Sequence, residues 1–222
     1  MKEEFVWIPV EVEGKTLKLE GRFAPGEAYS HGVVICHPHP LYGGDMDNGV
    51  VVTLQKAFYD AGFTTMRFNF RGVGASGGSY GGGQGEVEDL SAVCEFMKAR
   101  GIKHIYGAGY SFGSWILLKS LPRESFNGLV LVAPPVNLLD FEDLKIPGSI
   151  PSFILVGSRD EFCSQDQLQT WLQKTTQSDS DHFPVSVSII EGENHFFWNS
   201  LSKVFNCVRE EAKKWLIKDA QF

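Results

Sequence analysis

The chain has few of the features that would tie it to a nucleic acid or a membrane. Its 20 basic residues are outnumbered by 27 acidic ones, and the net charge of −7 argues against a nucleic-acid partner. No segment approaches the roughly 18 consecutive apolar residues of a membrane span. Residues 1–5 include two acids where a signal peptide would carry basic and then apolar residues. We therefore expect a cytoplasmic protein without a membrane partner.

Cysteine is also sparse, and its spacing excludes two kinds of site. The four cysteines lie far apart with no Cys-x-x-Cys pair, so we expect free thiols and no metal site or disulfide framework among them; they are Cys36, Cys94, Cys163 and Cys207. The hydrophobic content of 43% is that of an ordinary globular protein. A length of 222 residues predicts one domain spanning 1–222 with a large core.

The N-terminal segments predict an antiparallel hairpin. Residues 5–12 and 16–23 flank a short turn, and Leu17 and Leu19 alternate with charged residues, as in a strand with one solvated face. Pro9 favours an edge strand, because proline cannot donate a hydrogen bond to a neighbouring strand.

The rest of the chain alternates between expected strands and expected helices. The strands are expected at 32–36, 63–70, 102–106, 129–133, 152–156 and 185–190. The helices are expected at 48–61, 86–100, 114–121, 164–175 and 201–217, and the polar stretch 176–183 is expected to be a surface loop. This order predicts the α/β class, with a doubly wound, mostly parallel sheet covered by helices on both faces.

A Gly-x-Ser-x-Gly motif at 109–113 lies between a strand and a helix, where it is typical of a nucleophile elbow. Ser111 would sit on a sharp, strained turn, and side chains at the two flanking glycines would collide with the neighbouring strand and helix. Glycine and serine are common in this chain, so the five residues alone are equally compatible with an ordinary turn.

Two further residues follow other expected strands and complete a catalytic set. Asp160 comes after 152–156 and His195 after 185–190, so the order Ser111, Asp160, His195 is that of a nucleophile-elbow triad. The imidazole would take the serine proton, and the carboxylate would orient the imidazole. Asp160 alone could be a helix cap and His195 alone a surface histidine, but the joint placement favours the triad.

The segment 37–44, His-Pro-His-Pro-Leu-Tyr-Gly-Gly, follows the strand next to the elbow and is expected to supply an oxyanion donor. The first donor would be the N–H of Phe112. Since proline has no N–H, we select Leu41 as the second donor, with Tyr42 as the alternative. His39, Tyr42 and Tyr110 are candidate substrate-binding residues.

Two competing sites are considered and disfavoured. His37 and His39 with Asp45 and Asp47 would need a third histidine at metal-ligand spacing, so no metal site is expected. The Gly-x-Gly-x-x-Gly of 72–77 is followed by further glycines rather than by a helix, so we expect a mobile loop near the site and not a dinucleotide site.

These motifs resemble the α/β-hydrolase superfamily over essentially the whole chain. Residues 37–48 look more narrowly like small hydrolases related to dienelactone hydrolases, although Ser111 stands where those enzymes use cysteine. The resemblance implies an eight-stranded sheet with its second strand antiparallel, and acyl transfer to water without a cofactor.

The short length of the segment 134–150 limits the kind of substrate that we expect. Only 17 residues, 134–150, occupy the place of a helical lid, so we expect an open site and esters of small or medium acyl groups. Trp115 and Trp198 are expected in core or rim packing. A thioesterase, a serine peptidase for small peptides, or a catalytically silent binding relative are the alternatives. The partner would be a small-molecule ester, and the protein a monomer or homodimer.

Overall fold

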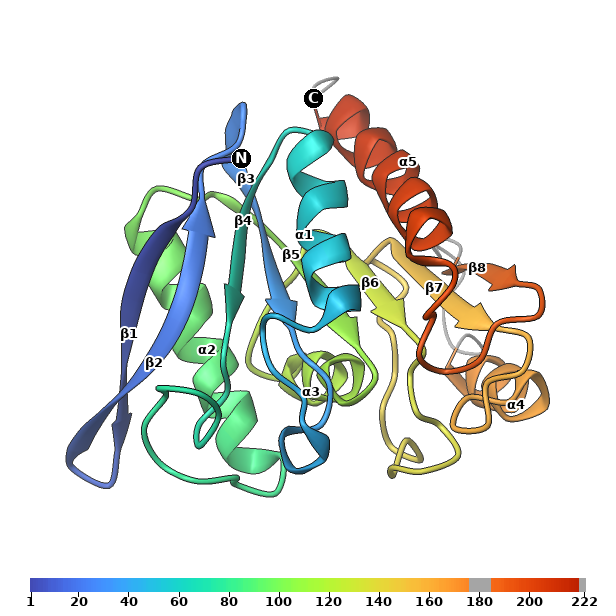
Figure 1. Ribbon diagram of the computed structural model, residues 1–222, viewed down its shortest axis with the longest axis horizontal. Helices are drawn as coiled ribbons and strands as arrows, with labels where there is room; N and C mark the ends of the chain where they lie inside the picture. Colours follow the sequence, from blue (N-terminus) through green and yellow to red (C-terminus); the bar gives the residue numbers. More distant parts are fainter. Residues whose placement is uncertain (176–184, 220–222) are drawn as a thin grey trace.

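A computed structural model describes residues 1–175 and 185–219, and its eight strands form one sheet (Figure 1). The strands are β1 (Glu4–Val12), β2 (Lys15–Ala24), β3 (Ala28–Cys36), β4 (Phe63–Phe68), β5 (His104–Tyr110), β6 (Leu129–Val132), β7 (Ser152–Gly157) and β8 (Val185–Ile190). The helices are α1 (Gly49–Asp60), α2 (Gln84–Ala99), α3 (Phe112–Ser120), α4 (Gln165–Thr175) and α5 (Leu201–Asp219). The polar stretch 176–183, expected to be a surface loop, lies outside the described residues.

The strand order is β1-β2-β4-β3-β5-β6-β7-β8. Strand β2 runs antiparallel to β1 and β4, and the pairs from β4 to β8 are parallel. This confirms the α/β class and the antiparallel second strand. Strand β1 lies at the edge of the sheet, as Pro9 predicts. An edge strand tolerates proline because one of its sides has no neighbouring strand to which an N–H would have to donate.

Successive side chains of the buried strands point to opposite faces of the sheet and pack into two separate hydrophobic cores. On β3, Val34 packs into the core beneath α2, α3 and α4, whereas Val33 and Ile35 pack into the core beneath α1 and α5. Figure 1 shows α1 and α5 side by side over one face of the sheet. Burial on both faces explains why these strands are apolar runs rather than alternating ones.

Strand β5 extends to Tyr110, four residues beyond the expected end at 106. Its glycines resemble a loop in sequence, but they serve close packing here. A Cβ on Gly107 would lie 2.7 Å from a methyl of Leu117, so α3 could not approach the sheet as it does. Helix α3 accordingly begins at Phe112, directly after Ser111 and within the elbow motif, and not at 114.

The segment between β6 and β7 contains no helix and forms no lid. Two tryptophan side chains fix it from below: Trp115 Nε1 donates to the Asp140 carbonyl at 2.7 Å, and Trp171 Nε1 donates to the Leu144 carbonyl at 2.8 Å. The site at the ends of the strands is therefore open, as the short length of this segment predicts.

Candidate active site

The carboxyl ends of β5, β7 and β8 bring the three predicted catalytic side chains together. His195 Nε2 lies 2.9 Å from Ser111 Oγ, and His195 Nδ1 lies 2.9 Å from both carboxylate oxygens of Asp160. Since a carboxylate only accepts hydrogen bonds, Nδ1 carries the ring proton and Nε2 is free to accept from the serine hydroxyl. The three residues thus form a continuous hydrogen-bonded relay.

Ser111 occupies the strained turn that the elbow motif predicts. Its φ of 53° and ψ of −117° lie outside the regions that most residues adopt. A Cβ on Gly109 would come within 2.5 Å of the Gly113 carbonyl carbon, and a Cβ on Gly113 within 2.3 Å of the Cys36 carbonyl oxygen. Both glycines are therefore needed for the strand, turn and helix to approach one another.

Asp160 is held by the backbone that follows it. Its Oδ1 accepts hydrogen bonds from the N–H groups of Phe162 and Cys163, each at 2.9 Å. The side chain of Asp160 is fully buried, so these donors and His195 replace the water that the carboxylate would otherwise bind. Both donors precede α4, so Asp160 stabilises a local turn and does not cap that helix, and its carboxylate keeps the contact to His195.

His195 is oriented by contacts on several sides. The Tyr110 hydroxyl donates to the His195 carbonyl at 3.0 Å, which ties the β8 loop to the end of β5. The rings of Phe162 and Phe196 meet the imidazole edge to face, with centroids 4.9 and 5.6 Å away. Neither phenylalanine was identified from the sequence, because a single aromatic residue in a loop gives no pattern.

A cavity of about 510 Å³ opens above Ser111. Its lining comprises Pro38, His39, Tyr42, Gly43, Gly44, Asn48, Tyr110, Ser111, Phe112, Pro135, Leu138, Leu139, Phe162, His195 and Phe196. The three predicted substrate-binding residues, His39, Tyr42 and Tyr110, are all in this lining. No lysine, arginine, aspartate or glutamate belongs to it, so the described wall of the cavity is neutral apart from histidine.

The structure gives no support to Leu41 as an oxyanion donor. The Leu41 N–H donates to His39 Nδ1 at 3.2 Å, and its side chain is 66% exposed outside the cavity lining. The Tyr42 N–H is also in use, because it donates to the His39 carbonyl at 3.1 Å. A short 3₁₀ turn over Pro40–Tyr42 makes these bonds, and this turn could not be inferred from the proline spacing. Among the described residues no acceptor is found for the N–H groups of Phe112 and His39, which both line the cavity.

His37 is a buried structural residue. Its Nδ1 donates to the Pro38 carbonyl at 2.6 Å and its Nε2 accepts from the Phe70 N–H at 3.1 Å. Burial is the main cause that lowers the pKa of His37 from 6.5 to about 4, so the ring is neutral at physiological pH. Within 1–175 and 185–219, no group of three or more histidine, cysteine or acidic side chains is arranged to hold a metal ion.

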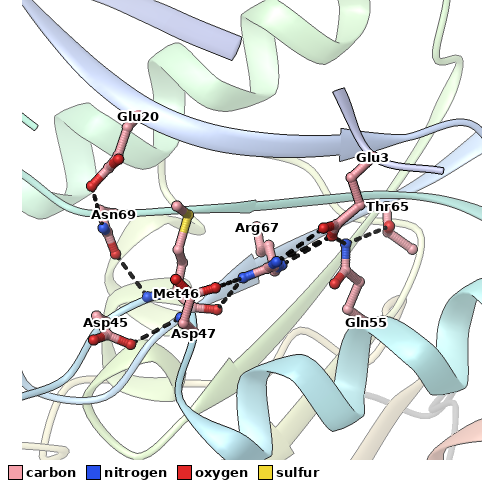
Figure 2. A network of polar contacts seen from close by, with 9 residues as sticks. All are labelled: Glu3, Glu20, Asp45, Met46, Asp47, Gln55, Thr65, Arg67 and Asn69. Atoms are coloured by element: carbon pink, nitrogen blue, oxygen red, sulfur yellow. Dashed lines mark hydrogen bonds and ion pairs between the residues drawn. The ribbon is translucent and has the colours of Figure 1, made fainter. Parts of the chain in front are cut away.

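Side chains at the end of β4 fix the loop that carries His39 (Figure 2). Both peptide groups of Met46 are bound: its N–H donates to Asn69 Oδ1 at 2.7 Å, and its carbonyl accepts from Arg67 at 2.9 Å. The buried Arg67 also pairs with the carboxylates of Glu3 and Asp47. The cavity wall contributed by this loop is therefore set by strand β4.

The glycine-rich loop over 71–83 is extensively hydrogen-bonded, which argues against the expected mobile loop. Arg71 forms three hydrogen bonds with the buried carboxylate of Asp89, at 2.7 to 2.9 Å. Burial is the main cause that raises the pKa of Asp89, and Arg71 opposes it. The buried Glu86 accepts from the N–H groups of Gly81 and Gly83, each at 2.7 Å.

The same loop lacks the geometry of a dinucleotide site. Helix α2 begins at Gln84, beyond the Gly-x-Gly-x-x-Gly of 72–77, so the helix does not start within the motif as a dinucleotide site requires. The loop reaches the candidate site through Tyr80, whose hydroxyl lies 3.3 Å from His39 Nε2.

The four cysteines and the two tryptophans near the site differ in how far they are buried. All four cysteines are free, and burial raises the pKa of the Cys94 and Cys163 thiols. Trp115 is buried in the core, whereas Trp198 is 74% exposed and stacks on Phe196. No helix within the described residues is long and apolar enough to cross a membrane.

Comparison with known proteins agrees with this fold and site. A family model described as serine aminopeptidase, S33, matches residues 32–145. An uncharacterized protein of Rickettsia prowazekii (strain Madrid E), RP471, is 35% identical over 186 residues, which are 81% of this chain and 78% of that protein.

Two solved structures extend the similarity over nearly the whole chain. An α/β serine hydrolase homologue from Coxiella burnetii is 35% identical, with a TM-score of 0.84 over 95% of this chain and 98% of that one. A Xanthomonas campestris α/β serine hydrolase without a lid is 27% identical, with a TM-score of 0.82 over 97% of this chain and 96% of that one.

Fold, site and relatives together define a lid-less homologue of the serine hydrolases. The chain belongs to the α/β-hydrolase superfamily, in the family that the serine aminopeptidase S33 model describes. The narrower relation to dienelactone hydrolases stays a prediction.

Proposed function

We propose that the protein is a serine esterase that hydrolyses neutral carboxylic esters of small or medium acyl groups through an acyl-enzyme. The observation that carries this proposal is the relay Ser111–His195–Asp160, with contacts of 2.9 Å at each link, at the base of an open and uncharged cavity. A serine hydroxyl is a weak nucleophile near neutral pH unless such a base accepts its proton.

The reaction follows from the direction of these hydrogen bonds. Ser111 Oγ attacks the ester carbonyl while its proton moves to His195 Nε2, and Asp160 stabilises the resulting imidazolium. His195 then returns the proton to the departing alcohol. Water then attacks the acyl carbonyl carbon and gives a proton to His195. When the bond to Ser111 breaks, His195 returns that proton to Ser111 Oγ and the acid leaves. Every step uses groups of this chain, so the proposed enzyme needs no cofactor.

The negative charge that develops on the carbonyl oxygen needs preorganised donors. We assign this role to the N–H groups of Phe112, at the first position of α3, and of His39. Both residues line the cavity and neither N–H has an acceptor among the described residues. The start of α3 adds a favourable helix dipole at the same position.

The uncharged wall favours an ester over a peptide. An aminopeptidase has to bind a protonated terminal amine, and a carboxylate is the usual partner of such a group. The described lining of the cavity contains no acidic side chain, and the carboxylate of Asp160 is fully buried against His195. A charged peptide terminus would therefore lose its hydration without a compensating ion pair. A thioesterase with a neutral substrate is compatible with the same wall.

The test compares an ester with a peptide-like amide. Wild-type protein should hydrolyse ethyl butyrate in a pH-stat assay, and should hydrolyse leucinamide far more slowly. Ser111→Ala should lower the ester rate by at least about 1000-fold, because the nucleophile is removed while the cavity is retained. A folded wild-type protein that cleaves leucinamide and no ester would contradict the proposal. Binding without any turnover would instead support a catalytically silent relative.

A further inference from the structure

Two large aromatic side chains beside the catalytic histidine are exposed to solvent. Phe196 is 40% exposed and Trp198 is 74% exposed, and their rings stack with centroids 5.1 Å apart and planes 19° from parallel. Phe196 also lines the catalytic cavity. The pair therefore extends an apolar surface outward from the cavity, beginning at the residue that follows His195.

The loop that presents this pair is fixed at several points. Phe197, between the two exposed rings, is fully buried and has a φ of 53°, which is unfavourable for a bulky residue. The Phe197 carbonyl accepts from the Ser200 N–H at 3.0 Å, and the Phe196 N–H donates to Asn194 Oδ1 at 3.0 Å. The exposed rings are thus held outward by a turn whose central side chain is anchored in the core.

The chemistry of ester cleavage indicates which part of a substrate would meet this surface. When the tetrahedral intermediate collapses, the bond between the carbonyl carbon and the alcohol oxygen breaks, and its electron pair stays on that oxygen. The oxygen takes the proton from His195 Nε2, and the acyl group remains on Ser111. The alcohol must therefore lie within hydrogen-bonding reach of His195, on the side that Phe162 and Phe196 flank.

We propose that Phe162, Phe196 and Trp198 form a leaving-group subsite that selects esters of hydrophobic alcohols carrying a planar aromatic ring. This inference rests on the proposed esterase function. Aromatic side chains gain from stacking on other rings beyond the apolar area they cover, so a planar group is favoured over a chain of equal size. No charged side chain belongs to the described lining of the cavity, so the alcohol would be neutral.

The test keeps the acyl group constant and varies the alcohol. Ethyl acetate and 2-(2-naphthyl)ethyl acetate both release primary alcohols, so their ester bonds have similar intrinsic reactivity. We expect wild-type protein to prefer the naphthyl ester in kcat/KM, and Trp198→Ala to reduce that preference about tenfold. Trp7→Ala is the matched control, because Trp7 is another exposed tryptophan in an aromatic pair, with Phe5 on β1, and should keep the wild-type preference.

A second measurement follows binding without turnover. Free 2-(2-naphthyl)ethanol should inhibit ethyl acetate hydrolysis competitively, and Trp198→Ala should raise its inhibition constant about tenfold while Trp7→Ala does not.

The outcomes separate the two proposals. An unchanged alcohol preference and inhibition constant in Trp198→Ala, with esterase activity present, would overturn the subsite alone. An effect of Trp198→Ala that follows acyl length in a series of ethyl esters would also overturn it, because the surface would then bind the acyl side. Absence of hydrolysis of every ester by folded wild-type protein would overturn the proposed function and this subsite with it.

Discussion

Acidification should destabilise the protein through His37, the histidine beneath the loop that carries His39. Its ring is fully buried, with one nitrogen donating to the Pro38 carbonyl and the other accepting from the Phe70 N–H. Protonation would convert the accepting nitrogen into a donor that faces another donor. The folded state therefore holds His37 neutral, whereas the unfolded chain protonates it near its ordinary pKa.

The magnitude follows from the two pKa values. The pKa of His37 is lowered from 6.5 to about 4 on folding, so between these values the unfolded state binds more protons than the folded state. Stability rises with pH wherever that is so, and it is lost as the pH falls below 6.5. From pH 7.5 to pH 5.0, His37 alone should remove about 2 kcal/mol from the free energy of unfolding.

Urea unfolding at the two pH values measures this loss in wild-type protein and in His37→Gln, whose side chain can donate and accept but does not titrate. Other groups also affect the pH dependence of stability. The raised pKa of Asp89 acts with the opposite sign to that of His37, and the lowered pKa of His39 acts with the same sign. Their contributions cancel in the difference between the two proteins. We expect the variant to lose about 2 kcal/mol less than wild type on acidification. Equal losses in the two proteins would refute the assignment of a neutral buried His37.

Three substitutions test the elbow, the loop and the relay. Gly113→Ala places a Cβ 2.3 Å from the Cys36 carbonyl oxygen, so unfolding by urea should show a loss of about 1–3 kcal/mol, and an unchanged midpoint would contradict the packing argument. Asn69→Ala leaves the buried Met46 N–H without its acceptor, which should cost about 1–3 kcal/mol and lower kcat, with both read on the same sample. Asp160→Asn should lower kcat about 10⁴-fold with little change in stability, since an amide favours the wrong tautomer of the histidine; a change below tenfold in ester hydrolysis would count against the relay.

The sequence was sufficient to predict the fold class and the three relay residues, because these rest on local signals. Buried parallel strands are apolar runs, and residues just past their carboxyl ends converge at one edge of the sheet whatever the loops do. Ser111, Asp160 and His195 occupy such positions, and the structure places them in hydrogen-bonding contact.

Features that depend on long-range partners were not predictable. The N–H of Leu41 is used by His39 in a 3₁₀ turn, and nothing in the spacing of the prolines indicates that bond. The glycine-rich loop is held by Asp89 and Glu86, whose burial depends on how α2 packs. Phe196 and Trp198 are exposed because Phe197, between them, is buried in the core. Which of the three aromatic residues is buried depends on core packing and cannot be read from the loop sequence.

The central claim, an activated serine at the elbow, is tested most directly by covalent labelling. A fluorophosphonate should modify wild-type protein once, at Ser111, as read by intact mass and peptide mapping. Ser111→Ala should not react, and Asp160→Asn and His195→Ala should react far more slowly, because the nucleophile loses its base. Folded wild-type protein that is not labelled, or labelling that persists unchanged in all three variants, would contradict the account.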